Sequence, residues 1–73
     1  MTQYGIAKHR TSGERWAIAL GHNAMIAEAY GPLEIGEGMT AEDVDDILTN
    51  QFTETLEDTA TWLDSQPIDI TLY

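Results

Sequence analysis

The chain has 73 residues and no cysteine, and thirteen acidic residues against three basic ones give it a net charge of −10. This length predicts one domain over residues 1–73, with a small core that no disulfide can reinforce. The negative field should repel nucleic acid and anionic membranes and attract basic protein surfaces.

We expect no segment of this sequence to carry the chain into or across a membrane. No apolar run approaches the ~20 residues that span a bilayer. The N-terminus, Met1–Tyr4, lacks the basic and apolar segments of a signal peptide. We therefore expect a soluble cytoplasmic protein that binds neither membrane nor nucleic acid directly.

The charges are unevenly distributed along the chain. Lys8, Arg10 and Arg15 are the only basic residues, and twelve acidic residues follow Arg15. Two explanations are open: a basic partner, or adaptation to a high-salt cytoplasm, where proteins carry excess Asp and Glu, little Lys and often no Cys.

The first thirty residues predict a three-stranded antiparallel meander. Residues 2–10 and 15–20 alternate apolar and polar or small side chains, and a third run covers 24–30. A turn at 21–23 offers Gly21 and Asn23 for positive φ. A helix remains the alternative for 15–30, because this stretch holds five alanines.

A loop is expected at residues 31–39, which contain three glycines and a proline. A single helix is then predicted over residues 40–64, with Thr40 as its N-cap and its end near Ser65, before Pro67. One apolar stripe follows helical spacing, with Phe52 at its centre and expected to be buried. Its members are Val44, Leu48, Phe52, Leu56 and Leu63.

Residues 68–73 alternate and predict a final strand. Ile68, Ile70 and Leu72 should face the core, with Asp69, Thr71 and Tyr73 facing solvent. The fold class is α+β: an antiparallel four-stranded sheet with one long amphipathic helix, in the order β-β-β-α-β.

Catalytic and metal-binding motifs are missing from the sequence, so we expect no enzyme activity, cofactor or metal. His9 and His22 have no second ligand or nucleophile at a useful spacing. Gly36–Gly38 has no following lysine and lies among acids that would repel phosphate. The acids from Glu42 to Asp46 do not fit a calcium loop, because Leu48 stands where a glycine is needed.

The acidic face of the predicted helix is the candidate partner-binding site. Seven acids fall on an arc of about 160° opposite the apolar stripe and spread over about 33 Å. With Asp45 they place one charge per ~4 Å, close to the ~3.4 Å spacing of phosphates in a nucleic-acid strand. Ile47 lies on the acidic flank, and Trp62 at the edge of the stripe. The predicted partner-binding residues are Glu42, Asp43, Asp46, Ile47, Glu54, Glu57, Asp58 and Asp64.

In length, charge and lack of catalytic motifs, the chain resembles the small acidic proteins that phages use against host defence, including anti-CRISPR proteins and DNA mimics. This resemblance implies a nucleic-acid-binding target, such as a CRISPR effector, blocked at its DNA-binding surface. The β-β-β-α order also resembles HicB-type antitoxin domains, without the DNA-binding segment that usually follows them. The expected function is a protein inhibitor that binds a basic nucleic-acid-binding protein. The alternative is a salt-adapted interaction or structural domain without mimicry.

Overall fold

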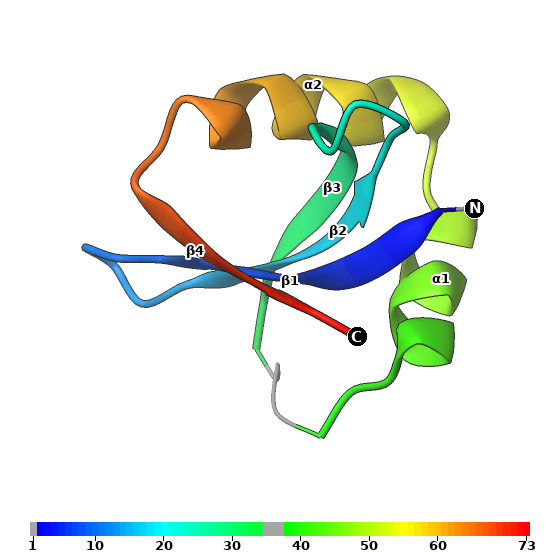
Figure 1. The fold of residues 1–73 in the computed structure, drawn as a ribbon, viewed down its shortest axis with the longest axis horizontal. Coiled ribbons are helices and arrows are strands. Elements are labelled where there is room, and N and C mark those ends of the chain that lie inside the picture. Colours follow the sequence, from blue (N-terminus) through cyan, green and yellow to red (C-terminus); the bar gives the residue numbers. More distant parts are fainter. Residues whose placement is uncertain (1, 35–37) are drawn as a thin grey trace.

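Figure 1 shows a four-stranded antiparallel sheet with two helices. The computed structural model describes residues 2–34 and 38–73. The strand order is β3-β2-β1-β4, so the last strand pairs with the first. The elements are β1 (Gln3–His9), β2 (Arg15–Leu20), β3 (Ile26–Leu33), α1 (Ala41–Thr49), α2 (Thr53–Asp64) and β4 (Ile68–Leu72).

The meander predicted for the first thirty residues is confirmed, and the helical alternative for residues 15–30 is wrong. β2 pairs with β1 on one side and with β3 on the other. Its two alanines, Ala17 and Ala19, lie on one face of the sheet, where α1 packs. The turn between β2 and β3 differs from expectation, because positive φ falls on Ala24, at 61°, and not on Gly21 or Asn23.

The predicted loop over 31–39 begins too early, because β3 continues through Gly31 and Pro32 to Leu33. Leu33 pairs with Arg15, which keeps this segment in the sheet. Proline lacks a backbone N–H, and an edge strand such as β3 tolerates it. Residues 35–37 of the predicted loop, and with them most of the Gly36–Gly38 segment, lie outside the described residues.

The single helix predicted over residues 40–64 is wrong, since α1 ends at Thr49 and α2 begins at Thr53. A straight helix of that length would measure about 37 Å, but the longest extent of the Cα trace is 29 Å. The break lets α1 contact β1 and β2 while α2 packs along β3. Both predicted ends are confirmed, with caps at Thr40 and Ser65.

The break also overturns the expected burial of Phe52. Its backbone is extended, with φ −72° and ψ 131°, and its side chain is 84% exposed. The rest of the apolar stripe is buried as predicted: Val44, Leu48, Leu56 and Leu63.

The core lies on both faces of the central strand β2. Trp16, Ile18 and Leu20 pack on one face against residues of α2. Ala17 and Ala19 pack on the other face against Val44 and Leu48 of α1. The small side chains on the α1 face let that helix approach the sheet closely.

The final strand is present, but its predicted burial is only partly right. Ile68 packs against the core, whereas Ile70 and Leu72 are 44% and 43% exposed. These residues face the α2 side of the sheet, since Ile70 is paired with Ala7. However, α2 packs along β3 at the opposite edge, so it leaves the far end of β4 uncovered.

Candidate partner-binding surface

The predicted N-cap of α1 forms a capping box. The backbone N–H of Asp43 donates to the Thr40 hydroxyl at 3.3 Å, and the backbone N–H of Thr40 donates to the Asp43 carboxylate at 3.0 Å. Asp43 thus satisfies a free backbone group at the helix start, where the helix dipole also favours its charge. This acid has a structural role apart from any partner.

Asp45 connects α1 to the first strand. The Tyr4 hydroxyl donates a hydrogen bond to the Asp45 carboxylate at 2.9 Å. This bond is the main reason that the pKa of Tyr4 is raised above its ordinary value, with smaller contributions from burial and from the charges of Asp45 and Glu28. Asp45 also accepts from the Thr49 hydroxyl at 3.4 Å. Its carboxylate therefore helps to dock α1 onto β1.

The other predicted binding residues of α1 fall into two groups. Glu42 and Asp46 are exposed. Ile47 is half-buried and packs against the core on the α1 face. It therefore offers a partner less apolar surface than its position in the sequence suggests.

The acids of α2 form an exposed charged face. Glu54, Glu57, Asp58 and Asp64 are exposed. In the described part of the chain, none of these four side chains has a hydrogen-bond or ion-pair partner. They occupy an arc of about 120° and spread over about 15 Å of helix. The helix contains no basic residue to balance them.

The helix break separates the acids of α1 from those of α2. The two helices run in different directions around the sheet (Figure 1). The structure therefore brings together the four acids of α2, but it does not form the continuous straight ridge expected over residues 42–64. Only the acids of one helix at a time can therefore align with a single strand of phosphates.

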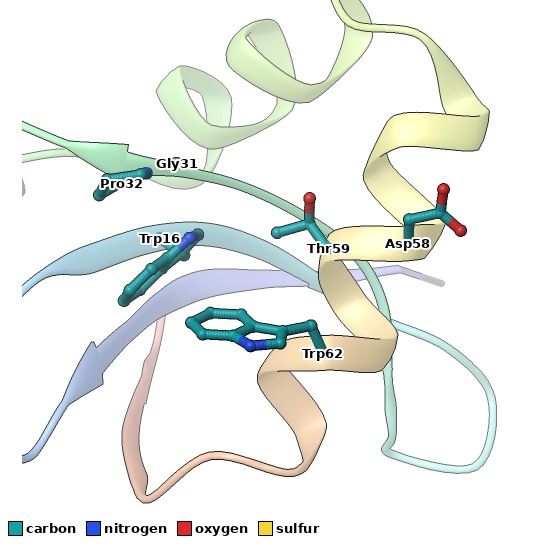
Figure 2. Close-up of a pocket in the computed structure, with 6 residues that line it drawn as sticks. All are labelled: Trp16, Gly31, Pro32, Asp58, Thr59 and Trp62. Atoms are coloured by element: carbon teal, nitrogen blue, oxygen red, sulfur yellow. The ribbon is translucent and has the colours of Figure 1, made fainter.

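A hollow of about 390 Å³ opens beside this acidic face (Figure 2). The Trp16 and Trp62 rings lie 5.5 Å apart between centroids, with an angle of 53° between their planes. Trp16 is 4% exposed and Trp62 is 47% exposed. The hollow is lined by Trp16, Gly31, Pro32, Asp58, Thr59 and Trp62.

Gly31 lets Trp16 lie close against β3. A Cβ atom at position 31 would stand 2.7 Å from Cδ1 of Trp16 and 2.9 Å from the Arg15 carbonyl oxygen. The wall of the hollow thus depends on position 31 being glycine, which has no side chain. The sequence does not predict this site, because Gly31 and Pro32 resemble loop residues. One local signal points to it: Asp58 and Thr59 stand four and three residues before Trp62, so all three side chains share one face of the helix.

The basic end of the chain lies around the β1–β2 hairpin, and its charges are partly paired. Arg10 forms an exposed ion pair with Asp69 of β4 at 3.0 Å. His9 Nδ1 accepts hydrogen bonds from the backbone N–H groups of Thr11 and Ser12, while Nε2 lies 3.3 Å from the Gln66 side-chain oxygen. His9 thus orders the hairpin turn and joins it to the segment before β4.

Within residues 2–34 and 38–73, no group of three or more His, Cys, Asp or Glu side chains has an arrangement that could hold a metal ion. Neither described helix is long and apolar enough to cross a bilayer. Comparison with protein-family models, curated proteins and solved structures gives no match to this chain.

Proposed function

We propose that this protein inhibits a nucleic-acid-binding protein by docking the acidic face of α2 on its basic surface. The supporting observation is the set of four exposed α2 carboxylates without a counter-charge on the helix. An ordinary exposed helix is stabilised by opposite charges spaced i, i+4. In α2 the pair at this spacing, Glu54 and Asp58, is a pair of like charges, whose repulsion destabilises the helix. A basic partner relieves that repulsion.

The length of the face suits a short stretch of phosphate backbone. Four carboxylates over about 15 Å compare with about four phosphates at ~3.4 Å each. A groove lined with Lys and Arg for a nucleic-acid strand accepts such a helix by the same electrostatics. We therefore expect the protein to compete with nucleic acid for its target, as DNA mimics and anti-CRISPR proteins do. The proposed setting is the cytoplasm.

The first experiment identifies the partner and tests competition. A salt-eluted pull-down from a host lysate supplies the target, and fluorescence anisotropy follows displacement of labelled DNA from it. Binding measured by surface plasmon resonance should weaken steeply as salt rises, because the target's basic groove recaptures counterions.

A pair of charge-reversal variants then tests the role of α2. The Glu54→Lys/Glu57→Lys variant reverses two acids of the proposed face, and Glu14→Lys/Glu34→Lys makes the same change in net charge elsewhere. The first should lose association rate before any other property, because charges at the rim of an interface act mainly on encounter. The second should lose much less. Equal losses in two folded variants would show that only the net charge matters and would contradict docking by α2.

A further inference from the structure

The hollow lined by Trp16 and Trp62 joins apolar walls to an acidic rim. Consecutive turns of α2 supply Asp58, Thr59 and Trp62, and β2 supplies Trp16 (Figure 2). Asp58 belongs both to the hollow and to the acidic face, so the two surfaces are continuous. A ligand in the hollow would touch indole rings on one side and a carboxylate at the opening.

We propose that this hollow binds the guanidinium group of an arginine side chain from the partner. This inference rests on the proposed function for the source of the arginine, and it names the residue that would anchor the complex. A guanidinium is flat, permanently charged and weakly hydrated, so it stacks on aromatic faces better than an ammonium does. Tryptophan attracts cations more strongly than the other aromatic side chains.

The polar atoms around the opening match the donors of a guanidinium. The Thr59 hydroxyl donates its proton to the Thr55 carbonyl at 3.0 Å, which leaves its oxygen lone pairs as acceptors. Asp58 supplies a carboxylate, and guanidinium–carboxylate hydrogen bonds are among the stronger ones in proteins. In Figure 2 this carboxylate points away from the rings. Asp58 is exposed, however, and an exposed side chain changes rotamer readily.

The two indoles have different parts in this site. Trp16 is buried and is held against Gly31, so it forms a fixed wall. Trp62 is half-exposed and still has a ring face to cover. Binding a guanidinium would bury that face, and a partly desolvated aromatic residue at the centre of an interface often contributes much of its binding energy. The net charge of −10 adds a long-range attraction for the cation.

The test uses Nα-acetyl-arginine methylamide as the probe and the uncharged Nα-acetyl-citrulline methylamide as its control. Each is titrated into the ¹⁵N-labelled protein at constant ionic strength, and the indole N–H and backbone amide signals are followed. The arginine derivative should give saturable shifts at Trp62 and Thr59, with a dissociation constant on the order of 10 mM. Shifts that are absent, unsaturable or equal for citrulline would overturn the proposal.

Matched variants separate the hollow from the general negative field. Asp58→Asn should weaken binding of the arginine derivative about two- to fivefold, as expected for losing one exposed ion pair. Glu57→Gln removes the same charge from the neighbouring position, which does not line the hollow, and should change the affinity less. Trp62→Leu should weaken binding about two- to fivefold, and Trp62→Phe should restore part of it. Equal effects of Asp58→Asn and Glu57→Gln would contradict a specific site.

The probe experiment and the docking experiment can fail separately. Titration of the arginine derivative needs no partner protein, so a negative result leaves docking by the acidic face of α2 intact. If the protein binds the arginine derivative but its α2 face does not dock on a basic partner, the proposed function is refuted. The hollow then remains a guanidinium site.

Discussion

The hydroxyl of Tyr4 and the carboxylate of Asp45 meet at 2.9 Å, although the two residues are 41 positions apart in the chain. This hydrogen bond fastens α1 to β1 on the face of the sheet opposite most of α2. The phenol must be protonated to donate, which makes this contact sensitive to alkaline pH.

The first prediction concerns that sensitivity. The pKa of Tyr4 is raised in the folded state, mainly by the bond to Asp45. Its contribution to stability is therefore complete below the unfolded value of about 10 and is lost as pH rises through the folded value. Urea unfolding at several pH values between about 8 and about 12 should show a steeper alkaline loss of stability for the wild type than for Tyr4→Phe. Tyr73→Phe, which changes a tyrosine outside this contact, should follow the wild type. Parallel curves for wild type and Tyr4→Phe would count against the bond.

The second prediction concerns the break between the helices. Leu56 is 1% exposed and Phe52 is 84% exposed. Leu56→Ala should cost about 2–5 kcal/mol of unfolding free energy, whereas Phe52→Ala should stay within about 0.5 kcal/mol of the wild type. Denaturant unfolding followed by circular dichroism measures both. A large loss for Phe52→Ala would mean that residues 40–64 form one helix in solution.

The third prediction concerns the contact between Gly31 and Trp16. Gly31→Ala places a methyl group 2.7 Å from the indole and 2.9 Å from a backbone oxygen, so something must shift. We expect a loss of about 1–3 kcal/mol, typical of overpacking, with a change in tryptophan fluorescence. Gly21→Ala is the matched control, since its nearest neighbours stand at an ordinary 3.6 Å. Equal stability of the two variants would show that Trp16 has room to move.

The fourth prediction concerns the net charge of −10. Raising salt from about 0.01 M to about 0.1 M shortens the Debye length from ~30 Å to ~10 Å and screens self-repulsion. The melting temperature, followed by circular dichroism, should climb over this range. A flat curve would indicate that the acids are neutralised by bound ions. A rise that continues into molar salt would favour the salt-adapted alternative over a binding partner.

Local patterns were sufficient to predict most of the elements. Alternation in residues 2–10 and 15–20 located two strands, because successive side chains on a strand point to opposite faces. Thr40 and Pro67 marked the start of α1 and the end of α2 for reasons of backbone hydrogen bonding and sterics within a few residues. The charge of the surface was also readable, because acids without partners remain in water wherever the chain folds.

The sequence by itself therefore determined the strands, the outer ends of the helical region and the acidic character of the surface. Only the tertiary structure decided that the helical region breaks before Phe52, since the two helices pack on different strands, α1 on β1 and β2 and α2 along β3. It also decided that Ile70 remains exposed, because α2 packs along the opposite edge of the sheet. The hollow lined by Trp16 and Trp62 joins residues 46 positions apart. Periodicity reports which face of an element is apolar, whereas the size of the sheet and the path of the chain determine what covers that face.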